Sequence, residues 1–295
     1  MVATGVTLEW RPADLLYRRV SVATLAAGVV EVTLPPSTAA KALPDSLALP
    51  LAISVERLLV ARLVLRSSEN RSSFTGIEAG YAGDGARHTI TKFALQSDFG
   101  TIGGDFTLAA ARPYALGGTL DWSRGEGASR TFAHAVLGGT LERISGGLKG
   151  GIGALPLEGA AVLATFAGSW LPEFALAARD ADLAAVDAAL PRTKLSGTLT
   201  AGTDARGRLA GTLALTNAAA GTWTDRRLPL SSLATRVALD GGALRFDELH
   251  ARLGAGGRIA GSGRITGAGA EWDLALAVPT FTYATSEEDV GRSVN

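Results

Sequence analysis

The feature that most constrains the fold is an alternation of apolar and polar side chains that recurs along most of the chain. Between residues 51 and 65 every odd position except Arg57 is apolar, whereas polar residues such as Ser54 and Arg62 take even positions. The same alternation returns at residues 93–95, 213–215, 237–239 and 272–278. Because alternate residues of a strand point to opposite faces, the pattern predicts β-strands with one apolar and one wet face.

Turn signals separate these runs and predict how the strands connect. Gly83-Asp84-Gly85 and Asp240-Gly241-Gly242 are typical of tight turns between antiparallel strands. Only three short segments, residues 12–18, 36–43 and 182–190, have features of helices, and each contains or borders a proline. We therefore expect an all-β chain of consecutive hairpins with a few short helices.

A short motif of the form apolar-x-Gly-x-apolar indicates repetition. It occurs at residues 102–106, 116–120, 137–141, 195–199, 209–213 and, with Gly263 at its last position, 259–263. Two pairs of motifs begin 14 residues apart, which fits one strand and a turn. The central glycine shares the face of the apolar residues, so it leaves a notch there. We interpret the notch as a device for curvature or close approach, with bulges or turns as the alternative.

Composition favours an extended architecture over a compact core. The chain of 295 residues is 47% hydrophobic but only 6% aromatic, and it contains 37 glycines. Small apolar residues on a glycine-rich sheet suit a shallow, repetitive layer. The 28 basic residues balance the 28 acidic ones, so no global field favours nucleic acid. The absence of cysteine excludes disulfides and thiolate metal sites.

With these patterns the chain resembles the repeat-rich β domain of the TamB family, within the wider AsmA-like group. The resemblance covers roughly residues 5–281 and starts at Val6-Thr7-Leu8-Glu9-Trp10 before a short helix. Its most specific part runs from the hairpin repeat at Leu209 through Asn217 and Arg227-Leu228-Pro229-Leu230 to the glycines near 254–257. The family's membrane anchor and extreme carboxy-terminal domain have no counterpart here, which suggests a fragment of a longer protein.

The resemblance implies an elongated, curved antiparallel sheet folded into an open trough, a β-taco, with residues 1–281 as one domain and 282–295 as an irregular tail. It also implies a periplasmic, non-enzymatic segment, tethered to the inner membrane of a Gram-negative bacterium, that carries phospholipid between the inner and outer membranes and supports outer-membrane biogenesis. Phospholipid acyl chains and an outer-membrane barrel of the TamA type would be its partners, with no cofactor.

We expect a common set of apolar side chains to line the trough and solvate the cargo. The set consists of Leu59, Leu63, Phe93, Leu95, Leu116, Leu120, Leu199, Leu213, Leu215, Val237, Leu239, Leu274 and Leu276. A continuous lining without charges would let an acyl chain shift between equivalent positions. In the alternative fold, a closed β-sandwich or barrel, the same residues would only pack together.

Other functions remain as alternatives. Free sheet edges would allow assembly or translocation of outer-membrane proteins and autotransporters by strand templating. A β-repeat adhesin and a polysaccharide-active β-helix enzyme are more distant readings. For the enzyme, the paired carboxylates Asp180 and Asp182, or Asp247 and Glu248, are candidates, although solvated turns explain them more simply.

We predict neither a catalytic nor a metal site. His88, His134 and His250 lack metal-ligand spacing, and no nucleophile elbow or phosphate-binding loop is present. The sequence Trp223-Thr224-Asp225-Arg226-Arg227 places cations beside an aromatic ring, which suits a lipid headgroup, a partner protein or simply a polar turn.

Overall fold

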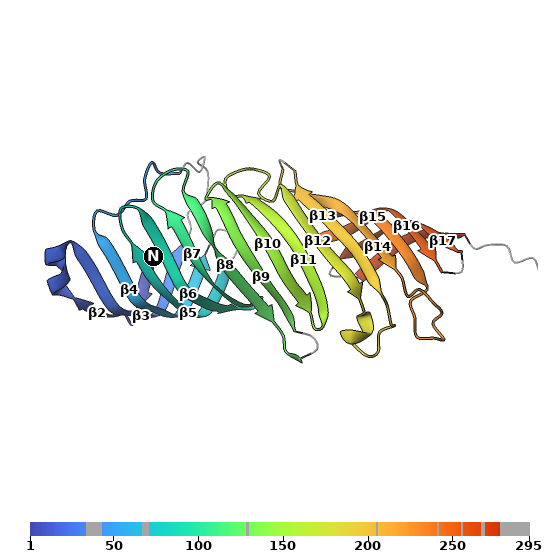
Figure 1. Ribbon diagram of the computed structural model, residues 1–295, viewed down its shortest axis with the longest axis horizontal. Helices are drawn as coiled ribbons and strands as arrows, with labels where there is room; N and C mark the ends of the chain where they lie inside the picture. The colour runs from blue at the N-terminus through green and yellow to red at the C-terminus, as the bar shows by residue number, and fades with distance from the viewer. Residues whose placement is uncertain are drawn as a thin grey trace, which may run out of the picture.

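The computed structural model describes residues 1–33, 43–66, 71–127, 130–204, 206–240, 242–254, 256–266 and 269–277. In these residues the chain forms one open, curved sheet of 18 strands, with only short helices beside it. Figure 1 shows the strands side by side along the long axis of the molecule, each running across its width. The expected all-β fold is thus confirmed, and the closed sandwich or barrel is excluded.

The strands follow the chain order almost without exception. They are β1 (Val2–Thr4), β2 (Thr7–Arg11), β3 (Arg19–Thr33), β4 (Ala52–Arg66), β5 (Arg71–Gly83), β6 (Arg87–Ser97), β7 (Gly100–Ala109), β8 (Ala115–Arg124), β9 (Thr131–Thr140), β10 (Arg143–Ile152), β11 (Leu155–Ala164), β12 (Glu173–Ala181), β13 (Leu195–Thr203), β14 (Leu209–Asn217), β15 (Leu230–Asp240), β16 (Ala243–Leu253), β17 (Arg258–Thr266) and β18 (Gly269–Ala277).

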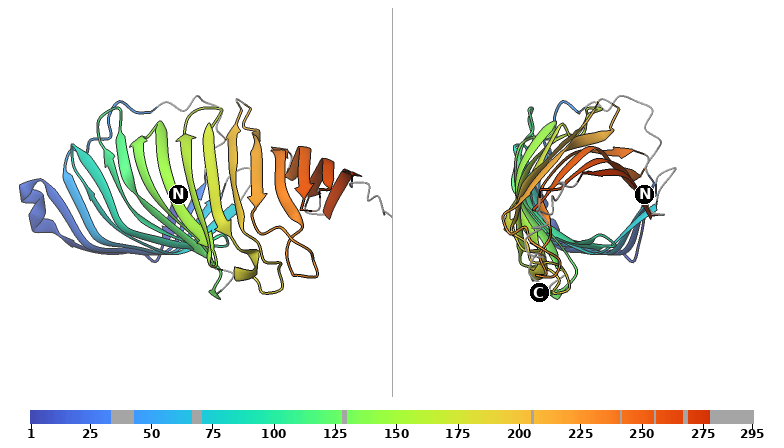
Figure 2. Two further views of the ribbon diagram at one scale, coloured as in Figure 1. Left: turned by 45° about the vertical axis from the view of Figure 1, so that its right-hand side comes forward. Right: turned by 90° about the vertical axis from the view of Figure 1, so that its right-hand side faces the viewer.

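Each strand from β4 to β18 pairs antiparallel with the next, as the turn signals predict. One pair breaks this rule, because β3 and β4 are parallel. β1 and β2 both pair with β3, at residues 29–31 and 21–26 respectively. In the end view of Figure 2 the sheet curls round without closing.

The turn at Asp84 shows how the sequence makes these hairpins. Its Oδ1 accepts hydrogen bonds from the backbone N–H groups of Ala86 and Arg87, at 2.7 and 2.9 Å. An aspartate side chain that binds the backbone two residues on replaces a regular turn bond. These bonds also lower the pKa of the Asp84 carboxyl below its ordinary value, because they favour the charged form.

The predicted helices are shorter than expected. A 3-10 helix, η1 (Pro12–Tyr17), falls within the expected segment 12–18, and η3 (Leu183–Ala185) covers one turn of segment 182–190. Asp182 caps η3 by accepting from the backbone N–H of Ala184. Most of segment 36–43 and the whole tail 282–295 lie outside the described residues.

The repeated glycines sit where neighbouring strands come close. At each of the six central positions, an added β-carbon would overlap a backbone carbonyl oxygen of the adjacent strand or turn: Gly104, Gly118, Gly139, Gly197, Gly211 and Gly261. All six have direct partners in the ladder, although Gly104, Gly197 and Gly261 each pair with a residue that borders a register shift in the neighbouring strand. Non-glycine residues instead hold three of the bulges, at Lys92, Asp180 and Glu248, each with a positive φ. Close approach therefore explains the glycine motif better than bulges do.

The sheet has almost no sealed core. In the described residues only eight apolar side chains are buried: Val22, Val64, Ala79, Ala110, Tyr114, Ala181, Leu249 and Ala251. The chain exposes 19443 Å², against about 11,700 Å² for a compact protein of this mass. Extensive contacts join only neighbouring strands, apart from those between η1 and β3. No second layer therefore covers the sheet in the described part of the chain.

Candidate functional site

The candidate site is the apolar face of the sheet, which we define by three rows of directly paired residues. The long row crosses every strand from β2 to β18: Trp10, Val22, Val55, Tyr81, Ile90, Phe106, Gly118, Leu137, Gly146, Ala161, Phe174, Ala201, Gly211, Val237, Phe246, Gly263 and Trp272. None of these side chains is charged.

A second row runs beside it from β6 to β18. It contains Leu95, Ile102, Trp122, Ala133, Gly150, Leu157, Ala178, Gly197, Leu215, Leu233, Ala251, Ile259 and Leu276. A third row between them joins Phe93, Gly104, Leu120, Ala135, Leu148, Gly159, Leu176, Leu199, Leu213 and Thr235. An uncharged surface therefore extends over more than half of the strands.

Eleven of the thirteen predicted lining residues belong to this face. Phe93, Leu95, Leu120, Leu199, Leu213, Leu215, Val237 and Leu276 stand in the rows. Leu116, Leu239 and Leu274 lie two positions from a row residue on their own strands, and so share its face. The structure thus brings together residues that are up to about 180 positions apart in the sequence.

Leu59 lies off the apolar face, and Leu63 stands outside the three rows. Leu59 lies opposite Glu78, which in turn pairs with Ala94 on the polar side of β6. The cause is an irregularity between Val55 and Leu58, which shifts the register and reverses the alternation that the sequence suggests. Leu63 lies opposite Phe74, outside the three rows.

The apolar face is accessible at its carboxy-terminal end. Trp272, Leu274 and Leu276 of β18 are 45%, 48% and 62% exposed, although all three lie on this face. In the middle of the sheet Leu199, Leu213 and Leu215 are half-buried, whereas their polar-face neighbours Thr198 and Thr212 are exposed. Because no second layer packs here, we attribute the shielding to the curvature of the sheet itself (Figure 2).

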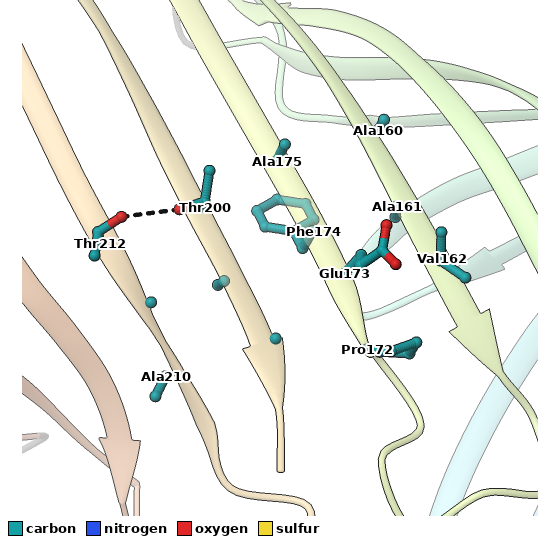
Figure 3. A pocket seen from close by; sticks show the side chains of 13 residues that line it. Ala160, Ala161, Val162, Pro172, Glu173, Phe174, Ala175, Thr200, Ala210 and Thr212 are labelled. Carbon is teal, nitrogen blue, oxygen red and sulfur yellow. Dashed lines mark hydrogen bonds between the residues drawn. The ribbon is translucent and has the colours of Figure 1, made fainter.

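The opposite face carries the charges. Its ion pairs include Arg236 with Glu248, Arg264 with Glu271, and Arg143 with Glu173, all solvent-exposed. Such pairs contribute at most about 1 kcal/mol each. A depression of about 470 Å³ lies on this face, and Figure 3 shows Glu173 and the hydrogen-bonded pair Thr200 and Thr212 among its lining residues. The two faces of the sheet therefore differ sharply in polarity.

The carboxylates singled out in the sequence, and two of the three histidines, have structural partners. Asp182 accepts from the backbone N–H of Thr193, and Asp247 pairs with Arg245. His134 bonds Asp121 at 2.7 Å, and His88 bonds the Tyr81 hydroxyl at 2.8 Å. Within the described ranges no three His, Asp or Glu side chains form a group able to hold a metal ion.

Sequence reasoning missed most of the aromatic residues on the apolar face. Phe106, Phe174, Phe246 and Trp272 stand in the long row, and Trp122 in the second. The sequence signal that could have placed these aromatic residues on the apolar face is their alternation with other apolar residues, which is clearest in residues 272–276. Phe246 and Trp272 also contact each other, with ring centroids 5.4 Å apart.

The fold and site define an open, elongated β-sheet protein with one continuous apolar face. Comparison with family models, curated proteins and solved structures finds no match. None of the helices that the structure describes has the length and apolar composition needed to cross a bilayer.

Proposed function

We propose that this chain is a TamB-like bridge segment that carries phospholipid acyl chains along its apolar face. The single observation that supports this function best is the long row, in which seventeen paired residues include no charge. Exposed apolar area is unfavourable by about 25 cal/mol per Å², so such a face favours an apolar partner.

Acyl chains fit this face better than a rigid ligand does. Each buried methylene contributes roughly 0.8 kcal/mol, wherever along the row it lies. Because the three rows present similar apolar groups at every strand, an acyl chain that slides by one strand exchanges one set of contacts for an equivalent set. The arrangement supports movement of lipid rather than tight binding at one position.

Lipid mass spectrometry of the purified chain tests the proposal. We expect copurified phospholipid in the native chain and a marked loss in Leu213→Asp, which places a charge in the third row. Ala214→Asp is the matched control, because Ala214 is the next residue of β14 and lies exposed on the polar face. A lipid-free native chain, or equal lipid content in both variants, would argue against lipid carriage.

A second function, strand templating of outer-membrane proteins, is favoured by the edge of the sheet. In the described residues β18 pairs only with β17, and all nine of its residues are exposed. Its other edge has backbone groups free to accept a further strand. Crosslinking from Asp273 to an unfolded barrel protein, in a chain free of lipid, would favour this function over the first.

A further inference from the structure

The amino-terminal end of the sheet carries a second apolar feature, the tip, which we define as residues 11–19. It contains η1, which connects β2 to β3 and lies at one extreme of the long axis (Figures 1 and 2). Pro12 starts η1, and Arg18 ends it in a left-handed conformation, with its backbone N–H bonded to Leu15. The turn is therefore locally determined.

The side chains of the tip point into solvent. Leu15, Leu16 and Tyr17 are 45%, 86% and 77% exposed, because β3 is the only element with which η1 makes extensive contact in the described residues. Leu8 and Trp10 of the adjoining β2 are 53% and 40% exposed. A single exposed leucine is ordinary, but five large exposed apolar side chains on a protruding turn and the strand beside it indicate a binding surface.

Cations surround this patch. Arg11, Arg18 and Arg19 are all exposed, and within the described ranges none of them forms an ion pair. Asp14 is the only acidic residue of the tip, so residues 11–19 carry an excess of positive charge in a chain whose formal net charge is zero. Leucine and tyrosine with flanking arginines suit a bilayer interface, where acyl chains take the apolar groups and phosphates take the cations.

We propose that the tip inserts into the surface of a lipid bilayer that contains anionic phospholipid. Leu16 and Tyr17 enter the headgroup region, while Arg11, Arg18 and Arg19 contact lipid phosphates. The long row begins at Trp10, at the base of the tip. If lipid is carried along the apolar face, as the proposed function states, then docking of the tip places the first residues of that face at the membrane.

Vesicle cosedimentation with the full chain tests the docking surface. The probes are vesicles of phosphatidylcholine and phosphatidylglycerol in equal parts, and vesicles of phosphatidylcholine alone. We expect the native chain to prefer the anionic vesicles, and the double variant Leu16→Asp with Tyr17→Asp to lose at least about tenfold in affinity. Arg11→Gln with Arg19→Gln should remove mainly the preference for anionic lipid.

Phe99→Asp is the matched control. Phe99 is an exposed aromatic residue, at 71%, in the turn between β6 and β7. This variant should bind vesicles like the native chain, and circular dichroism should show the same strand content in all variants. Equal binding by the tip variant and the native chain would overturn the proposal. So would native dimerisation that the tip variant abolishes, without any vesicle binding.

The same samples separate this inference from the proposed function. Cosedimentation reports docking even when no lipid copurifies, whereas mass spectrometry reports lipid on the apolar face even when docking is lost. If the tip variant loses vesicle binding but keeps its copurified lipid, the result would support both the docking of the tip and the carriage of lipid on the apolar face. Vesicle binding by a chain that never copurifies lipid would leave the tip as a membrane anchor and remove lipid carriage.

Discussion

The indole ring of Trp272 in β18 lies across Gly263 in β17, so closely that a β-carbon at Gly263 would overlap the ring. The two residues are direct partners in the long row, and Phe246 follows on the other side of Gly263. The glycine thus allows a large aromatic side chain to lie flat on the sheet. The same arrangement recurs along the row, where the side chain of Phe106 lies over Gly118 and that of Leu137 lies over Gly146.

Gly263→Val should therefore destabilise the carboxy-terminal strands. Trp272 must leave its position or β17 must shift, at a cost of about 1–3 kcal/mol. Hydrogen exchange of the amides in β17 and β18 measures this effect. Gly147→Ala is the control, because an added β-carbon there meets no atom within 4 Å. It should be neutral or slightly stabilising, and equal protection in both variants would contradict the expected packing.

The Asn217 side chain should make a large contribution to the free energy of unfolding. The side chain is buried, accepts from the backbone N–H groups of Lys194 and Ala219, and donates to the carbonyls of Leu228 and Leu230. Asn217→Ala leaves these groups without partners, and we expect a loss of roughly 2 kcal/mol or more in the free energy of unfolding. Chemical denaturation measures it. The exposed neighbouring change Thr216→Ala should cost much less.

The Asp84 turn should make stability depend on pH in the acidic range. Because backbone hydrogen bonds lower the pKa of Asp84 in the folded chain, its contribution is present above the ordinary aspartate pKa and is lost as pH falls through the lowered folded value. Asp84→Asn retains an oxygen acceptor that does not titrate. Its deficit in melting temperature against the native chain should therefore be largest at neutral pH and shrink on acidification.

Asp273→Asn provides the control for that measurement. In the part of the chain that the structure describes, the Asp273 carboxylate accepts no backbone hydrogen bond. The difference between this variant and the native chain should depend less on pH. A deficit for Asp84→Asn that stays constant across the acidic range would show that the turn bonds do not distinguish the two protonation states.

Ala133→Asp should slow lipid movement more than lipid uptake. Ala133 stands between Trp122 and Gly150 in the second row, near the middle of the sheet. A carboxylate there interrupts the uncharged surface, and an acyl chain that passes it must desolvate the charge. Transfer of a fluorescent phospholipid between vesicles should fall by about tenfold or more. Val136→Asp, on the exposed polar face of the same strand, should transfer lipid at the native rate.

The sequence by itself determined the strands, their turns and most of the apolar face. Alternation is a local property with a period of two residues, so residues such as Leu213 and Leu215 reveal their common face without any knowledge of their neighbours. The Asp84 turn is equally local, since its hydrogen bonds reach only two and three residues along the chain. The six repeated glycines were likewise visible, and close approach was among the reasons expected for them, but only the structure distinguished it from bulges.

Only the tertiary structure decided which residues meet across the sheet. The parallel pairing of β3 with β4 and the irregularity between Val55 and Leu58 depend on contacts between strands, and the latter moves Leu59 opposite Glu78. The buried Tyr114, whose hydroxyl donates to the carbonyl of Pro44, joins segments 70 residues apart. Register and bulges follow from the best pairing of backbones distant in sequence, and a pattern read along one strand carries no information about that choice.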